Sequence, residues 1–309
     1  MKVIKRGIMF LLAIVMVLGA PITAMAEESS IDVTEEDAEG GYDITEEVEA
    51  SLKATAINTS TDNDALIAIA AQNVLDAEVV TYTSSNQISC LVQLGYSCNG
   101  TDGPISITKG TYTYKKYWWT ETTDVYLVCL SGTDTDAENT TTDYWTDLLS
   151  GFEFDNKYVQ NVKKAIQENI PSNSNIILAG HSLGGMVCQQ VAAESELKSN
   201  YNILNTVTFG SPLIDGFARE GVVKRLGDTS DIVPYLSVST IYNIFWQAAG
   251  LNTESGGYGW DVLSAHCKSY NRNDVWGAYD VVGVKNGGAT LSLDFSTTKF
   301  YASPVIVIE

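Results

Sequence analysis

The residues with the clearest chemical potential surround a serine, in Gly180-His181-Ser182-Leu183-Gly184-Gly185. The segment matches G-x-S-x-G, in which the two glycines let a strand and a helix approach closely around a sharp turn. It stands between an apolar run, Asn175 to Ala179, and a helical pattern, Leu183 to Leu197, which is the context that the motif requires. Such a turn holds the serine hydroxyl clear of the sheet, so Ser182 is the candidate nucleophile.

A nucleophilic serine needs a general base, and the chain has only two histidines. His181 is adjacent to Ser182, and adjacent side chains diverge, so we interpret His181 as a packed residue under the turn. His266 is then the candidate base by elimination. The base needs an orienting carboxylate, and the residues alone leave four candidates open: Asp215, Asp228, Asp231 and Asp261.

Strands alternating with helices must position these groups. Apolar runs predict buried strands, apolar residues three and four positions apart predict helices, and an aromatic-rich run predicts part of a hairpin. The alternation predicts an α/β fold, with a mainly parallel sheet and helices on both faces. The predicted strands are 125–130, 175–179 and 203–209, the helices 64–76, 159–170 and 183–197, and the hairpin segment 112–119.

The C-terminal part, from about residue 280, is an unassigned β-rich tail. Asn286-Gly287 between apolar runs predicts a hairpin, and Val305 to Ile308 predicts a last strand.

Residues 1–26 have the pattern of a secretory signal peptide. Three basic residues precede an apolar run of 14 residues, shorter than the roughly 20 that a spanning helix needs. The small-residue site Ala24-Met25-Ala26 follows, and we expect cleavage after Ala26. The protein is therefore expected to be secreted and extracellular, without stable membrane insertion.

An acidic segment follows, in which residues 27–53 contain eleven acidic residues and one basic residue. We expect residues 27–55 to be disordered, as a propeptide, a spacer or a solvated tail, because this composition buries little apolar surface. The remaining residues, 56–309, form the expected catalytic domain.

Composition excludes several function classes. Acidic residues outnumber basic ones 38 to 18, and the net charge of −20 opposes binding to nucleic acid. Two histidines exclude a multi-histidine metal site, and the five cysteines form no C-x-x-C pair. Asp134, Asp136 and Glu138 alternate as in a calcium loop, but the turn glycine and closing glutamate are absent. We expect no metal and no cofactor.

Taken together, these segments resemble the class 3 lipases, which are fungal-lipase-like α/β hydrolases. Besides the serine segment, the resemblance is carried by Leu130-Ser131-Gly132-Thr133, Thr208-Phe209-Gly210-Ser211-Pro212, Asp231-Ile232-Val233-Pro234 and His266-Cys267-Lys268-Ser269-Tyr270. It implies an α/β-hydrolase fold, a catalytic triad of Ser182, Asp231 and His266, and an oxyanion hole at Leu183 and Thr133. The family usually has arginine before the Gly-Thr, where this chain has Ser131.

The resemblance implies hydrolysis of a carboxylic ester, either a lipid ester such as an acylglycerol or another small-molecule ester. In such lipases the lid follows the oxyanion strand, and here that stretch, residues 134–147, is polar and acidic, which favours short-to-medium acyl chains. Ile241, Ile244 and Phe245 are candidates for an acyl-pocket wall or a lid, or for core packing. One alternative is a glycan- or cell-wall-binding protein that uses the aromatic run at 112–119. Another is a thioesterase or peptidase with the same triad.

Overall fold

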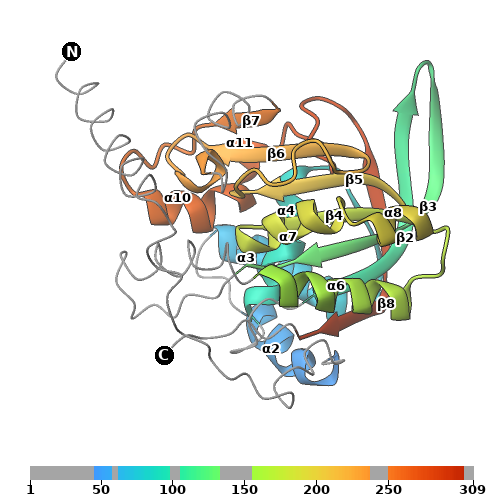
Figure 1. Cartoon of the computed structure of the whole chain (residues 1–309). Helices are drawn as coiled ribbons and strands as arrows, with labels where there is room; N and C mark the ends of the chain where they lie inside the picture. The colour runs from blue at the N-terminus through green and yellow to red at the C-terminus, as the bar shows by residue number, and fades with distance from the viewer. Residues whose placement is uncertain (1–44, 58–61, 98–104, 133–154, 237–249, 303–309) are drawn as a thin grey trace, which may run out of the picture. The chain divides into compact units, whose positions relative to one another are not determined.

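The computed structural model describes residues 45–57, 62–97, 105–132, 155–236 and 250–302 (Figure 1). These residues belong to one compact unit, Gly40–Glu309. Their strands form one eight-stranded sheet in the order β1-β8-β2-β3-β4-β5-β6-β7. The pairs from β3 to β7 are parallel, and β1, β8 and β2 add an antiparallel edge. The expected α/β fold with a mainly parallel sheet is confirmed.

The predicted strands at 125–130, 175–179 and 203–209 lie in β3, β4 and β5, and the predicted hairpin segment at 112–119 joins β2 to β3, whereas β1, β6, β7 and β8 were not predicted as strands. The strands are β1 Val79–Tyr82, β2 Ile105–Lys116, β3 Trp119–Leu130, β4 Asn175–His181, β5 Asn202–Phe209, β6 Val222–Asp228, β7 Leu251–Glu254 and β8 Thr290–Tyr301. The helices of four or more residues are α2 Thr45–Ile57, α3 Asp62–Leu75, α4 Ser85–Gln93, η3 Leu94–Ser97, α6 Asp155–Asn169, α7 Leu183–Val191, α8 Ser195–Asn200, α10 Val262–Lys268 and α11 Asn273–Trp276. Two shorter 3-10 turns are η4 Val233–Tyr235 and η5 Ser269–Asn271.

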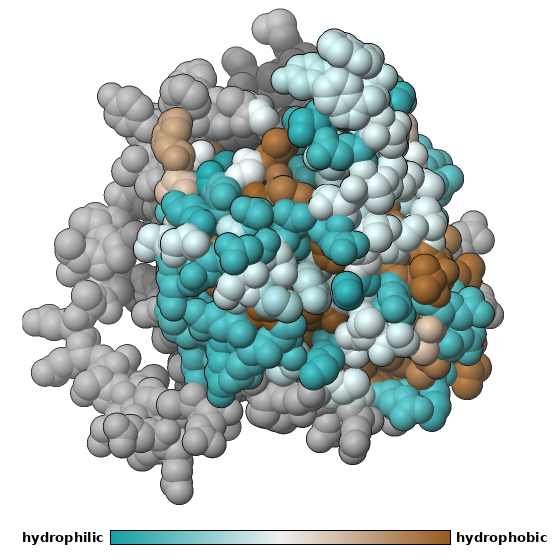
Figure 2. Space-filling view, turned by 90° about the vertical axis from the view of Figure 1, so that its right-hand side faces the viewer, coloured by the Kyte–Doolittle hydropathy of each residue, from teal (hydrophilic) through white to brown (hydrophobic). Residues whose placement is uncertain are grey.

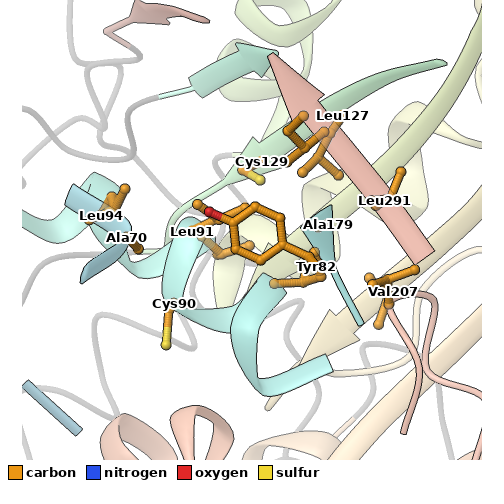
Figure 3. Close-up of a cluster of buried hydrophobic side chains, with 14 of the residues drawn as sticks. Ala70, Tyr82, Cys90, Leu91, Leu94, Leu127, Cys129, Ala179, Val207 and Leu291 are labelled. Atoms are coloured by element: carbon orange, nitrogen blue, oxygen red, sulfur yellow. The ribbon is translucent and has the colours of Figure 1, made fainter. Parts of the chain in front are cut away.

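The sheet has a hydrophobic core on each face, because successive side chains of a strand point to opposite sides. In β4, Ile176 and Leu178 belong to the cluster that packs against α6, α7 and α8. Ile177 and Ala179 belong to the other cluster, which packs against α2, α3 and α4. Figure 3 shows this second cluster from within, where Ala179 lies among side chains of α4, β3 and β8. The helices thus cover both faces, as the sequence predicts.

The predicted hairpin is present and extends beyond its neighbours. β2 pairs with β8 only as far as Thr113, and β3 pairs with β4 only from Tyr126 onward. The residues between these points pair only within the hairpin, which stands away from the sheet in Figure 1. The hairpin stands at the right-hand side of Figure 1, and Figure 2 views the molecule from that side, where the described surface is mostly hydrophilic or intermediate.

The expected disorder of the acidic segment is wrong for residues 45–55, which lie in α2. Val48 and Leu52 are buried one helical turn apart and pack into the core. The amide of Phe300 in β8 also donates to the hydroxyl of Thr45. The acidic composition of the segment as a whole did not reveal this apolar stripe, because only a few positions of the helix face the core. Residues 27–44 and the signal-peptide pattern at 1–26 lie outside the described residues.

Two predicted elements take a different form in the structure. The single helix expected over 183–197 is divided at Ala192, and α8 begins at Ser195. The hairpin expected at Asn286-Gly287 is a tight turn instead, in which Asn286 has φ 56° and a single bridge joins Tyr279 to Lys285. The buried Asp280 carboxylate accepts the amides of Val282, Val284 and Ala289, and these bonds take the place of a strand ladder. The predicted strand at 305–308 lies outside the described residues.

Within the described part of the chain, no helix has the length and apolar character to cross a membrane.

Candidate active site

Ser182 occupies a strained turn between β4 and α7. Its backbone angles are φ 54° and ψ −124°, a region that residues with a side chain rarely adopt. The Ser182 amide donates to the carbonyl of Phe209 at 3.0 Å, which ties the turn to the end of β5. This is the strand-turn-helix geometry expected of G-x-S-x-G.

The flanking glycines are required by close backbone contact. A Cβ at Gly180 would lie 2.5 Å from the carbonyl oxygen of Gly184, where the strand and helix cross. A Cβ at Gly184 would overlap the carbonyl of Leu130 in β3, and one at Gly185 would lie 2.6 Å from Cβ of Ser211. The spacing of the motif therefore follows from the space available at this crossing.

His266 and Asp231 form a buried hydrogen-bonded pair. Nδ1 of His266, in α10, lies 2.8 Å from Oδ2 of Asp231, and both side chains are 1% exposed or less. The other carboxylate oxygen of Asp231 accepts the Val233 amide at 2.9 Å. A carboxylate on Nδ1 sets the imidazole orientation and leaves Nε2 for proton transfer.

The sheet brings this pair to the same edge as Ser182. β4, β5 and β6 are parallel, so their carboxyl ends lie side by side, and Ser182 and Asp231 follow β4 and β6. Between them, Gly210 follows β5 with φ 57°. A Cβ at Gly210 would lie 2.8 Å from Asp231 Oδ2 and 3.0 Å from His266 Nδ1. Gly210 thus lies between the Asp231–His266 pair and Phe209, whose carbonyl accepts the Ser182 amide.

Two of the other candidate carboxylates, Asp228 and Asp261, have structural partners. Asp228 is fully buried and accepts from the amides of Ser230 and Gly256 and from the hydroxyl of Ser269. Asp261 caps α10 by accepting the Ser264 amide at 3.1 Å. Asp215 lies in a turn with φ 49°. The structure therefore separates Asp231 from Asp228, which residue types alone did not.

His181 is packed beneath the turn, as expected. It is 3% exposed, and its Nδ1 and Nε2 lie 2.7 Å from the Tyr96 hydroxyl and 3.0 Å from the His266 carbonyl. Burial first, and then the proximity of His266, lowers the pKa of His181 well below its ordinary 6.5. His181 is therefore neutral at physiological pH.

Tyr270 is a site residue to which the sequence analysis assigned no role. Its hydroxyl donates to Asp231 Oδ2 at 2.6 Å and accepts the Asp228 amide at 3.1 Å. Burial, and then the Asp231 charge, raises the pKa of Tyr270 well above 10, so this donor keeps its proton. Tyr270 follows His266 by four residues, one helical turn, and this spacing is the signal that could have indicated it.

Several candidate residues lie outside the described residues: Thr133, Asp134, Asp136, Glu138, Ile241, Ile244 and Phe245. Leu183 is described and is the first residue of α7, where backbone N–H groups have no partner within the helix. In the described ranges, no group of three or more His, Cys, Asp or Glu residues could hold a metal ion.

Comparison with known proteins agrees with this geometry. A family model described as lipase (class 3) matches residues 106–240, which include the Ser182 turn and Asp231. No curated protein and no solved structure matches the chain. The family has the α/β-hydrolase fold, in agreement with the sheet, and the match supports a hydrolase of lipase or esterase type.

Proposed function

Residues 106–240 of this chain belong to the class 3 lipase family, and we propose that the protein is a serine hydrolase of carboxylic esters. Ser182 is the nucleophile, His266 the general base and Asp231 the carboxylate that orients it. The single observation that carries this proposal is the Asp231–His266 hydrogen bond of 2.8 Å at the sheet edge that also presents Ser182.

The reaction proceeds through an acyl-enzyme. Nε2 of His266 takes the hydroxyl proton of Ser182 while the serine oxygen attacks the ester carbonyl carbon. The tetrahedral intermediate collapses, and the leaving alcohol receives the proton from His266. A water molecule, deprotonated by the same nitrogen, then attacks the acyl-enzyme, which releases the acid and restores the serine. Asp231 orients the imidazole through Nδ1 and stabilises the imidazolium.

Backbone amides stabilise the oxyanion in this proposal. The Leu183 amide at the start of α7 is one donor, which the orientation of the helix N-terminus supports. The second is the amide of Thr133, on the resemblance to class 3 lipases. Gly132 is not available for this task, because its amide donates to the Tyr96 hydroxyl.

A fluorophosphonate probe tests the nucleophile directly. The proposal predicts one covalent adduct on Ser182, located by peptide mass spectrometry and absent from Ser182→Ala. Labelling should slow strongly in His266→Ala, because the hydroxyl then has no base. An adduct on another residue, or equal labelling of Ser182→Ala, would refute the assignment.

We propose that the substrates are esters with short-to-medium acyl chains. The polar composition of residues 134–147 supports this, since that stretch follows the strand before the site and offers little apolar surface to a long chain. Faster hydrolysis of emulsified long-chain triglyceride than of dissolved butyrate ester would contradict it. The same series, extended to thioesters and peptides, tests the thioesterase and peptidase alternatives.

Secretion is also proposed, on the pattern of residues 1–26. Expression with the native N-terminus should give a product in the culture medium that begins at Glu27, as read by N-terminal mass spectrometry. An intact N-terminus on protein retained in the cell would argue against export.

The hairpin tip supports a second candidate function, binding of an insoluble glycan. Tyr117 and Trp118 are 82% and 88% exposed, and Trp119 packs against both with ring centroids 5.2–5.7 Å apart. Tyr117 adopts φ 56° in a two-residue turn, where glycine or asparagine is favoured, so folding alone does not favour an aromatic residue there. Flat exposed rings of this kind can stack on sugar rings.

Pulldown on insoluble polysaccharide tests this candidate. Binding that survives Ser182→Ala and is lost in Trp118→Ala would support it. Equal binding of wild type and Trp118→Ala would refute a role for the tip.

A further inference from the structure

The hydroxyl of Tyr96 joins two segments that flank Ser182. It lies 2.7 Å from the amide nitrogen of Gly132 and 2.7 Å from Nδ1 of His181. Tyr96 belongs to η3, Gly132 follows β3, and His181 is the last residue of β4. One phenol therefore connects three elements that are far apart in the sequence.

The directions of these hydrogen bonds follow from their partners. The carbonyl of His266 can only accept, so Nε2 of His181, 3.0 Å away, carries the ring proton. In a neutral imidazole Nδ1 is then the acceptor, and it must receive the Tyr96 hydroxyl proton. The phenol oxygen accepts the Gly132 amide. A chain of hydrogen bonds thus links Gly132, through Tyr96 and His181, to the backbone of His266.

These hydrogen-bonded residues lie next to Ser182 on two sides. A Cβ at Gly132 would lie 2.9 Å from Cβ of Ser182 and 2.6 Å from the Tyr96 hydroxyl, so Gly132 is held tightly between them. The His181 ring lies 4.6 Å from the His266 ring, centroid to centroid. Movement of Tyr96 or His181 would therefore shift the Gly132 segment or the His266 backbone relative to the serine.

We propose that Tyr96 and His181 are positioning residues, which fix the positions of the Gly132 segment and the His266 backbone relative to Ser182. This inference rests on the proposed function, in which Ser182 and His266 are the reacting groups whose relative position matters. Both ring nitrogens of His181 are occupied, so it takes no part in proton transfer. Loss of the Tyr96 hydroxyl removes the partner of the Gly132 amide and misplaces reacting groups by fractions of an ångström, which lowers kcat more than substrate binding.

Kinetics with a matched control test this role. Tyr96→Phe should lower kcat about 10- to 100-fold and change KM by less than about threefold. Tyr201→Phe is the control, since the Tyr201 hydroxyl likewise bonds to a backbone group, the Ile170 carbonyl at 3.2 Å, but Tyr201 precedes β5 and lies at the amino ends of the parallel strands, away from Ser182. Its kcat should stay within about twofold of wild type. The double variant Tyr96→Phe/His181→Phe should lose about as much as His181→Phe alone, because the two residues act as a unit.

Imidazole NMR tests these hydrogen bonds by a readout that does not depend on activity, and it reports the tautomer in the wild-type protein itself. The protein has two histidines, so ¹⁵N-histidine labelling gives two sets of ring signals, which loss of one set in His266→Ala assigns. At neutral pH His181 should be the neutral Nε2–H tautomer, and Tyr96→Phe should move its Nδ1 signal. The Nδ1–H tautomer would overturn the proposed directions.

The outcomes separate the two proposals. Hydrolysis that survives Ser182→Ala would overturn the proposed function and the positioning role with it. Activity that is lost in Ser182→Ala but unchanged in Tyr96→Phe would overturn the positioning role alone.

Discussion

Ser182 holds a backbone conformation that opposes folding and serves the geometry of the site. Positive φ at a residue with a side chain costs about 1 to 3 kcal/mol, and at φ 54° Ser182 bears this cost at the carboxyl end of β4. The surrounding structure imposes it through the hydrogen bond to Phe209 and the close crossing of Gly180 and Gly184. Strain of this kind persists where function requires it.

Replacing Ser182 by glycine should therefore relieve the backbone strain, whereas replacing it by alanine should not. Ser182→Gly should unfold at a higher denaturant concentration than Ser182→Ala, by about 1 kcal/mol in the free energy of unfolding, because only glycine adopts this φ without strain. Both variants should lack esterase activity. Equal stability of the two proteins would show that the turn is not strained.

Substitution should distinguish the roles of Asp228 and Asp231, the two buried aspartates that were candidates for the orienting carboxylate. Asp231→Asn keeps the shape of the side chain but lacks the charge that stabilises the imidazolium, so kcat should fall about 10⁴-fold by analogy with other triads. Asp228→Asn loses acceptors for Ser269 and Gly256, so it should lower the unfolding temperature more than Asp231→Asn does. A larger loss of kcat in Asp228→Asn than in Asp231→Asn would reverse the assignment.

At the scale of elements, the site depends on the crossing of α7 over β3 and β4. A Cβ at Gly184 would overlap the carbonyls of Leu130 and Ser131. Gly184→Ala should therefore destabilise the fold by about 1 to 3 kcal/mol, the usual cost of overpacking. Gly216→Ala is the control, since the nearest atom to its Cβ would be 3.9 Å away. Equal denaturation midpoints for the two variants would contradict the tight crossing.

The elements that could be predicted are those with a periodic or glycine-marked pattern. The β4–α7 turn and the amphipathic α6 follow directly from such patterns, and so does the placement of Ser182. The break at Ala192 does not, because it depends on tertiary contacts such as the hydrogen bond from the Glu220 amide to the Ala192 carbonyl. Asp231 could not be ranked above Asp228 because the choice depends on which carboxylate reaches His266. Tyr96 was not predicted because it contacts the site across 85 residues of sequence.

At the scale of the whole molecule, the stability depends on pH through the acidic residues, which give a net charge of −20, and through the two buried histidines. Burial lowers the pKa of His181, so the folded state disfavours the proton that the unfolded chain accepts near pH 6.5. The stabilisation from neutral His181 is therefore complete above about pH 6.5 and is lost as the pH falls below it. The sign is the same as for a carboxylate with a lowered pKa.

This linkage predicts a pH-dependent difference between two proteins. Between pH 7.5 and 5.5, the free energy of unfolding of wild type should fall more than that of His181→Phe, by up to about 1.4 kcal/mol per pH unit below pH 6. The acidic residues are common to both proteins, so their contribution cancels. Parallel curves from urea denaturation would show that His181 takes up its proton equally in both states.

The most direct test of the proposed function is hydrolysis of p-nitrophenyl esters over a series of acyl lengths, with wild type beside Ser182→Ala. The geometry of Ser182, His266 and Asp231 predicts activity in wild type, and the polar composition of residues 134–147 predicts that it is greatest for short-to-medium chains. Ser182→Ala should lower kcat by on the order of 10⁶, as in other serine triads. Equal hydrolysis by both proteins, or none by a folded wild type on any chain length, would contradict the assignment of Ser182 as an ester-cleaving nucleophile.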